Sequence, residues 1–326
     1  MNVRALKSTP TWRIVLVLVG LLVAGLVGVI LTSYQRDIQQ ARQRIATGSQ
    51  VVQTPCGPIE YALAGDGPAV LLVHGAGGGY DQSLAFGEAL VRRGFRVIAM
   101  SRFGYLRTPL PKDATASAQA DAHACLLDAL NVPRAPIIGV SAGAPSTMQF
   151  ALRHPDRCSA MVLLVPAAYV PRPANAPPML TPVGTDFLFE TALKSDLLFW
   201  ASIRFARSTL TEAILATPLA VVENASAAEQ ARVGEFLELI LPVSPRRLGL
   251  LNDAAITASL QRYELERIAT PTLVISMADD LFGTFDGARY TAEHIPGARF
   301  IGYPSGGHLW VGHQDEVMAE ILAFLK

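Results

Sequence analysis

Short runs of consecutive apolar residues alternate with longer amphipathic segments along most of this chain. An uninterrupted apolar run is typical of a strand buried on both faces, whereas apolar residues spaced three or four apart indicate a helix. Helices are expected at 83–93, 116–130, 142–154 and 314–325. Strands are expected at Ala69–Val73, Arg96–Met100, Pro136–Val140, Ala160–Val165, Thr272–Ser276 and Arg299–Tyr303. This alternation predicts right-handed crossovers, and therefore an α/β fold built on a doubly wound, mostly parallel sheet.

Two segments depart from the alternation. Val51–Gln53 and Ile59–Ala64 flank a Pro-Cys-Gly-Pro turn, which predicts an antiparallel hairpin at the start of the fold. After residue 166 the strand pattern stops, and a proline-rich stretch is followed by mostly helical apolar sequence. We interpret residues 167–265 as a helical cap inserted into a core made of residues 51–166 and 266–326.

The segment Ile14–Leu31 contains eighteen residues in a row that are apolar or glycine. As a helix rising about 1.5 Å per residue it spans roughly 27 Å, close to the ~30 Å hydrocarbon thickness of a bilayer. Trp12 and Tyr34 flank it, as amphipathic rings do at membrane interfaces. We therefore expect an N-terminal transmembrane anchor in residues 1–34 and a polar stalk at 35–50. The alternatives are a cleaved signal peptide, whose apolar core is usually shorter, and a buried helix.

Charge and cysteine content narrow the classes of partner. Lys plus Arg and Asp plus Glu both total 27, so the formal net charge is zero. The sequence therefore lacks the basic footprint of nucleic-acid-binding proteins, and we expect no nucleic acid as a partner. Cys56, Cys125 and Cys158 are widely separated and form no Cys-x-x-Cys motif, so we expect buried free thiols and neither a zinc site nor a disulfide framework.

The pentad Gly139-Val140-Ser141-Ala142-Gly143 lies where an expected strand meets an expected helix. A sharp strand-to-helix turn exposes the central side chain, and glycines are needed because the two backbones nearly touch there. The helix N-terminus also favours negative charge developing beside the hydroxyl. We interpret Ser141 as a nucleophile and the N–H of Ala142 as a donor to an oxyanion. The alternative is a serine that only caps an ordinary helix.

A glycine-rich segment, His74 to Gly79, follows the first central strand. Backbone N–H groups in such a loop can bind an oxyanion, and the loop matches neither the P-loop nor the dinucleotide-binding pattern. We expect Ala76 to supply the second donor of the oxyanion hole, with Gly77 as the alternative. His74 is expected to orient the loop.

A nucleophilic serine requires a base, and six histidines are available. Gly306 and Gly307 precede His308 just after the last expected strand, which lets a loop carry the imidazole back over the sheet. His313 begins the final expected helix and is interpreted as a capping or surface residue. We therefore expect His308 to be the base.

The base in turn requires an orienting carboxylate. Asp279 and Asp280 lie just beyond the carboxyl end of the strand Thr272–Ser276, where functional groups gather in open α/β sheets. Either one suits the role, with the other making a loop-capping turn, and Asp286 is a weaker third candidate. The chain order of serine, aspartate and histidine is that of one fold in particular.

Together these segments resemble the α/β-hydrolase superfamily, in the lineage of small bacterial esterases and meta-cleavage-product hydrolases. The resemblance covers about Thr54 to Lys326 apart from the insertion. The motifs that carry it are HGAGGG (74–79), SRFGY (101–105), GVSAG (139–143), PTLVISMADD (271–280) and GGHLW (306–310). It implies the hydrolase fold with a helical cap, and it selects Asp280, the second residue of the pair, as the acid. The segment from Ser101 to Leu106 departs from the family's Asp-Arg-Pro-Gly-Tyr-Gly pattern, and a membrane anchor is uncommon there.

We therefore expect a serine hydrolase that cleaves carboxylic esters of apolar small molecules through an acyl-enzyme on Ser141, with no metal or organic cofactor. The alternatives are a C–C bond hydrolase of the meta-cleavage-product type and a non-catalytic ligand-binding protein. We expect a single-pass protein of a bacterial inner membrane. The basic residues Arg4, Lys7 and Arg13 before the apolar run favour a catalytic domain on the non-cytoplasmic side. The sequence does not indicate an oligomeric state.

Overall fold

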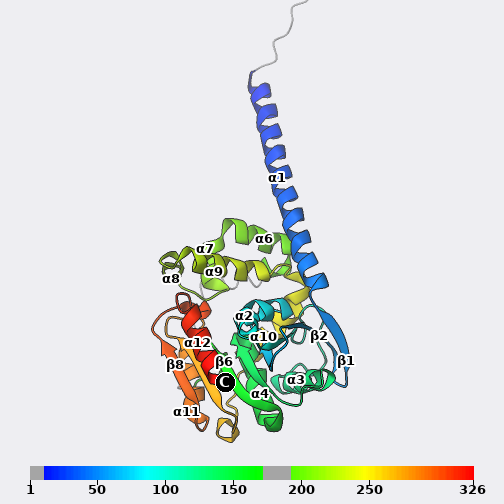
Figure 1. The fold of residues 1–326 in the computed structure, drawn as a ribbon. Coiled ribbons are helices and arrows are strands. Elements are labelled where there is room, and N and C mark those ends of the chain that lie inside the picture. The colour runs from blue at the N-terminus through cyan, green and yellow to red at the C-terminus, as the bar shows by residue number, and fades with distance from the viewer. Residues whose placement is uncertain (1–10, 172–191) are drawn as a thin grey trace, which may run out of the picture.

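The fold is built on one eight-stranded sheet, described by a computed structural model for residues 11–171 and 192–326 (Figure 1). The strand order is β1-β2-β4-β3-β5-β6-β7-β8; β1, β2 and β4 pair antiparallel, and all other neighbours pair parallel. The strands are β1 (Gln50–Thr54), β2 (Gly57–Ala64), β3 (Ala69–Val73), β4 (Arg96–Met100), β5 (Ala135–Val140), β6 (Cys158–Leu164), β7 (Thr272–Met277) and β8 (Arg299–Tyr303). The predicted doubly wound, mostly parallel α/β fold is confirmed.

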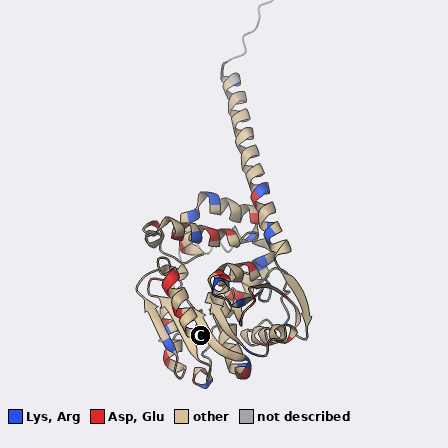
Figure 2. Cartoon of the chain, viewed as in Figure 1, with Lys and Arg blue, Asp and Glu red and all other residues tan. Residues whose placement is uncertain are grey.

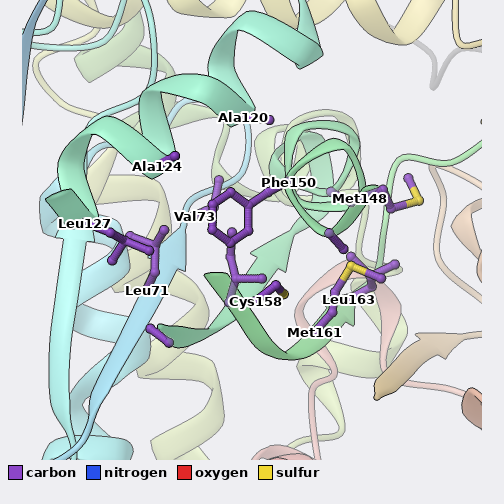
Figure 3. Close-up of a cluster of buried hydrophobic side chains, with 14 of the residues drawn as sticks. Leu71, Val73, Ala120, Ala124, Leu127, Met148, Phe150, Cys158, Met161 and Leu163 are labelled. Carbon is purple, nitrogen blue, oxygen red and sulfur yellow. The ribbon is translucent and has the colours of Figure 1, made fainter. Parts of the chain in front are cut away.

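Helices cover both faces of this sheet because the central strands are apolar on both sides. The helices are α2 (Tyr80–Arg92), α3 (Ala116–Ala129), α4 (Ala144–Arg153), α11 (Thr284–His294) and α12 (Gln314–Phe324). The helices α3, α4 and α11 lie on the face that carries Leu71 and Val73 of β3, and α2 and α12 lie on the face that carries Val70 and Leu72. Figure 3 shows Phe150 of α4 and other apolar side chains gathered over β3 on the first face.

The order of the strands places a crevice at the carboxyl edge of the sheet. From β3 the chain crosses to β4 on one side, and it then returns to β5 on the other side of β3. Ligands of open α/β sheets bind where the strand order reverses in this way. The segments that follow β3, β5, β7 and β8 therefore meet above this edge.

Five further helices lie between β6 and β7 in the described part of the chain, over the carboxyl edge of the sheet (Figure 1). They are α6 (Asp196–Phe205), α7 (Arg207–Ala213), α8 (Leu219–Glu223), α9 (Ala227–Leu239) and α10 (Arg247–Ala258), and we call them the cap helices. Their buried side chains, among them Phe199, Trp200 and Phe236, form a separate apolar cluster, the cap cluster. Residues 172–191 of the expected insertion lie outside the described residues, and the boundaries 167 and 265 stay a prediction.

The N-terminal helix α1 (Thr11–Thr47) runs without a break through the segments expected as anchor and stalk. Its upper part is exposed, and it is the one described helix that is long and apolar enough to cross a membrane. Its C-terminal part, residues 35–47, packs against the rest of the fold. Ile38 and Ala41 are buried in the cap cluster, the side chain of Arg42 reaches Asp196 of α6, and the Arg44 carbonyl accepts a bond from the hydroxyl of Tyr80. Residues 35–47 are thus part of the folded domain.

The expectation of three free thiols is wrong for two of the cysteines. Cys56, in the turn between β1 and β2, and Cys125, on α3, form a disulfide with their Cα atoms 6.2 Å apart. Cys158 is free and buried, and burial raises the pKa of its thiol to about 12. The pair is separated by 69 positions, so only the packing of the opening hairpin against α3 brings the two sulfurs together.

Candidate active site

Ser141 occupies a strained turn between β5 and α4. Its φ is 51°, in the left-handed region that residues with a side chain adopt at a cost of about 1–3 kcal/mol. The flanking glycines make the turn feasible: a Cβ on Gly139 would lie 2.3 Å from Thr147 Oγ1, and a Cβ on Gly143 would lie 2.7 Å from the carbonyl oxygen of His74. Strand and helix therefore press together around the pentad, as the sequence pattern predicts, and the Ser141 side chain is left facing the crevice.

The structure brings Ser141, His308 and Asp280 into one hydrogen-bonded chain. His308 follows β8 in a short 3₁₀ helix, and its Nε2 lies 2.8 Å from Ser141 Oγ. Its Nδ1 lies 2.7 Å from Asp280 Oδ2. With a neutral imidazole, Nδ1–H donates to the carboxylate and Nε2 accepts from the serine hydroxyl. Both His308 and Asp280 are buried, so water competes little for these bonds.

The candidate carboxylates occupy different positions. Asp280 also accepts bonds from the Thr284 hydroxyl and, at 2.9 Å, from the Phe282 N–H. Asp279 turns the other way and accepts from two backbone N–H groups, those of Gly306 at 3.2 Å and Gly307 at 2.8 Å. It thereby holds the loop that carries His308.

The other candidate acid, Asp286, and the other histidine considered, His313, lie away from the serine. Asp286 lies on α11 and forms an exposed ion pair with Arg289. His313 is the residue before α12, and its Nδ1 lies 2.8 Å from the Glu316 carboxylate.

The glycine-rich loop after β3 lies beside the serine. Its N–H groups are committed on both sides of Ala76: Gly75 donates to Gln82 Oε1 at 3.1 Å, and Gly77 donates to Tyr105 Oη at 3.2 Å. Within the described residues the N–H of Ala76 has no such partner. Ala76 lines the same cavity as Ser141, while Ala142 lies in the 3₁₀ turn Ser141–Gly143 that leads into α4.

His74 fixes the start of this loop from inside the fold. Its Nε2 accepts a bond from the Arg102 backbone N–H at 2.9 Å, and its Nδ1 lies 2.7 Å from the Gly75 carbonyl oxygen. Burial, together with the positive charge of Arg102, lowers the pKa of His74 well below its usual value. The imidazole is therefore neutral, with one nitrogen accepting and the other donating.

A buried ion pair between the core and the cap helices escaped the sequence analysis. The Arg102 guanidinium donates to both oxygens of Asp253 on α10, at 2.7 and 2.6 Å, and also to the carbonyl oxygens of His74 and Gly75. Tyr105 Oη donates to the same carboxylate. The segment that departs from the family pattern thus ties the glycine-rich loop to the cap. No local signal marks Asp253, because its partner lies 151 positions away.

Ser141 and His308 open onto a small apolar cavity of about 100 Å³. The core contributes Ser141, His308 and the glycine-rich loop, and Phe282 packs edge-on against the His308 ring at 5.0 Å. The remaining lining comes largely from the cap helices and the segments joining them: Ala213, Ile214, Leu215, Phe236, Ile240 and Leu250. Among the residues that the structure describes, no cluster of His, Cys, Asp and Glu is arranged to hold a metal ion.

Comparisons with known proteins agree with this architecture. A family model described as the alpha/beta hydrolase fold matches residues 68–311. An uncharacterized hydrolase of Bacillus subtilis is 27% identical over 282 residues, covering 83% of this chain and 95% of its own. A 2-hydroxy-6-oxononadienedioate/2-hydroxy-6-oxononatrienedioate hydrolase of Paraburkholderia xenovorans is 30% identical and covers 76% and 82%. The solved alpha/beta hydrolase fold protein of Nakamurella multipartita is 29% identical, with a TM-score of 0.65 over 85% of this chain and 99% of that one.

Proposed function

Because this chain belongs to the α/β-hydrolase family, we propose that it hydrolyses carboxylic esters of apolar small molecules through an acyl-enzyme on Ser141. The observation that carries the proposal is the hydrogen-bonded chain from Ser141 through His308 to Asp280 at the floor of an apolar cavity. An activated serine is the nucleophile of acyl transfer, and an apolar lining selects uncharged substrates.

Each side chain has one part in the reaction. Ser141 Oγ attacks the ester carbonyl carbon while His308 Nε2 takes its proton, and Asp280 stabilises the imidazolium that forms. The carbonyl oxygen becomes an oxyanion held by the N–H groups of Ala76 and Ala142, each contributing about 3–4 kcal/mol to the transition state. Collapse of the intermediate expels the alcohol, which receives the proton from His308. Water then cleaves the acyl-enzyme by the same steps, with no cofactor.

A fluorophosphonate probe tests the nucleophile. We expect the full chain to be labelled and Ser141→Ala to be unlabelled, with Ser146→Ala, a buried serine on the following helix, labelled like the wild type. An unlabelled wild type, or equal labelling of Ser141→Ala, would overturn the proposal. Either result would favour the alternative hypothesis, that the protein is a non-catalytic ligand-binding module.

Cleavage of a C–C bond is the second candidate function, favoured by the relative of Paraburkholderia xenovorans named above. The substrate in that name is a dianion, whereas no Lys or Arg stands among the described residues that line the cavity. A buried carboxylate requires a paired cation, and we therefore favour esters. We expect the protein to turn over p-nitrophenyl butyrate and not a dienoic ring-fission product. Turnover of the ring-fission product without turnover of the ester would select the C–C hydrolase.

We also propose that α1 anchors the protein in a membrane with the folded domain outside the cytoplasm. The length and exposure of its apolar part support the anchor. The Cys56–Cys125 disulfide supports the location, because disulfides persist in oxidising compartments. We expect a full-length chain that stays with the membranes through alkaline carbonate washing. We also expect external protease to degrade it in spheroplasts. A shortened chain in the soluble fraction would indicate a cleaved signal peptide.

A further inference from the structure

Helix α6 is apolar on both of its sides. Phe199 and Trp200 face inward and are buried in the cap cluster. On the other side Leu197, Leu198 and Phe205 are 38%, 44% and 73% exposed, and we call them the outer face of α6. A surface helix of a soluble domain usually presents polar residues outward, whereas a helix that is apolar all round is covered on both sides. The outer face of α6 therefore requires a partner.

The position of α6 along α1 identifies that partner. The Trp200 indole N–H donates to Asp37 at 2.9 Å, and its ring packs against Tyr34 with centroids 5.6 Å apart. Ile30, in the last turn of the apolar run, also packs against the cap cluster. Asp37 lies six residues beyond Leu31, which is about 9 Å along a helix. The headgroup region of one leaflet is ~5–8 Å thick. Tyr34, three residues and about 4.5 Å beyond Leu31, lies within it, and Asp37 lies at its outer border, so the Trp200 contacts place α6 at this depth.

The charges around α6 fit the same position. Figure 1 shows α6 on the side of the cap toward which the exposed part of α1 extends, and Figure 2 shows the positions of charged residues on α1 where it meets the cap. Arg36 on α1 and Arg204 on α6 are both exposed and share Asp37 as a partner. Arginines beside exposed leucine and phenylalanine are typical of helices that lie in the membrane interface.

We propose that the outer face of α6 rests in the lipid headgroup region of the bilayer that α1 spans. The cap and its cavity are then held at the membrane surface, and the substrates are esters that partition into the bilayer. The inference rests on the membrane anchoring and ester hydrolysis proposed above. Its occupant is the lipid surface, because α1 brings that surface to α6 whatever else is present.

A fluorescent probe on a single introduced cysteine tests the contact. The full chain carries Leu198→Cys labelled with an environment-sensitive dye, in vesicles of phosphatidylcholine and phosphatidylglycerol. The native cysteines do not compete, since two are paired and the third is buried. Leu63→Cys is the matched control, because Leu63 lies on β2 of the core and is 46% exposed.

We expect blue-shifted emission at residue 198, quenched by lipids that carry a spin label near the headgroup, and water-like emission without quenching at residue 63. Equal, water-like emission at both sites would overturn the proposal. A blue shift at 198 that lipid does not quench and that disappears on dilution of the protein in the membrane would overturn it as well, because a second copy would then cover the face.

Kinetics test the substrate class. The variant with Leu198→Glu and Phe205→Glu is expected to lose at least tenfold in turnover of a long-chain ester held in vesicles, with unchanged turnover of water-soluble p-nitrophenyl butyrate. Leu63→Glu is expected to change neither. Equal turnover of the vesicle-held ester by wild type and double variant would refute the substrate class. A wild type inactive on both esters would instead refute ester hydrolysis, while the fluorescence comparison would still decide the membrane contact.

Discussion

Replacing Asp253 with alanine removes the counter-ion of a buried guanidinium. Arg102 and Asp253 are both almost fully buried and form two hydrogen bonds of 2.7 and 2.6 Å. The alanine variant keeps Arg102 charged in the interior and also leaves the Tyr105 hydroxyl without this acceptor. We expect a large loss of stability, together with a looser glycine-rich loop.

The expected size follows from the geometry. With charge centres about 4 Å apart and an effective dielectric of about 20, the lost attraction is about 4 kcal/mol. Removing one partner of a buried pair typically costs ~3–5 kcal/mol, in agreement with this value. An exposed pair is worth much less. Glu88→Ala removes the partner of Arg92 on the surface of α2, and it should cost less than about 0.5 kcal/mol.

Urea unfolding of the full chain in detergent micelles measures these changes. Asp253→Ala should lower the unfolding midpoint far more than Glu88→Ala, and kcat on a soluble ester should fall at least about tenfold because Arg102 also holds the His74 and Gly75 carbonyls. The double variant Arg102→Met, Asp253→Leu removes both charges and should recover part of the stability, although the His74 and Gly75 carbonyls and the Tyr105 hydroxyl lose their partners. The reasoning is wrong if Asp253→Ala unfolds at the same urea concentration as Glu88→Ala. It is also wrong if the double variant is no more stable than Asp253→Ala.

Three more outcomes follow from the same structure. Asp280→Asn should lower kcat by about 10⁴-fold by disturbing the His308 tautomer, whereas Asp279→Asn, which touches only the loop backbone, should lower it by less than about 10²-fold. Burial lowers the pKa of His123 to about 3 and that of His74 well below its usual value, so both are neutral when folded. The stability they contribute is complete above about pH 6.5, and below it each lowers the free energy of unfolding by about 1.4 kcal/mol per pH unit; for His123 this loss continues to its pKa of about 3. Urea midpoints measured against pH should show the slope, and His123→Gln should reduce it by about 1.4 kcal/mol per pH unit. A thiol reagent at about pH 8 should find no reactive cysteine in the folded chain and only Cys158 after unfolding without reductant; two or three reactive thiols would contradict the disulfide.

The parts of this fold that the sequence predicted are those set by local patterns. The strands β3 and β4 begin and end at the expected residues, because a buried strand is a short apolar run with polar flanks. The bounds of β8, an edge strand that is only partly buried, were also predicted. The turn at Ser141 was predictable because the pentad itself carries the two glycines that the turn needs, although the close approach at Gly143 is to His74 in the loop after β3. Chain order and position at the carboxyl edge limited the acid to the Asp279-Asp280 pair and favoured His308 as the base, and the family resemblance selected Asp280; the structure brings Asp280 and His308 to the serine.

The parts that sequence reasoning missed depend on distant contacts. Helix α2 begins at Tyr80, three residues earlier than expected, because the Tyr80 N–H bonds to the Ser101 hydroxyl and Asp81 pairs with Arg246. The Cys56–Cys125 disulfide likewise joins segments with no common local pattern. Each partner is identifiable only after the sheet order and the cap position are known.

The continuity of α1 has a practical consequence for handling this protein. A soluble form cut at the first strand, near residue 49, would discard more than an anchor. It would uncover the surfaces that hold Ile38 and Ala41 and would remove the Arg44 carbonyl from the Tyr80 hydroxyl. These contacts reach both the cap and the core, so the lower half of α1 is a brace between them. The natural place to cut is just after Leu31, where the brace is kept and only the apolar run is lost.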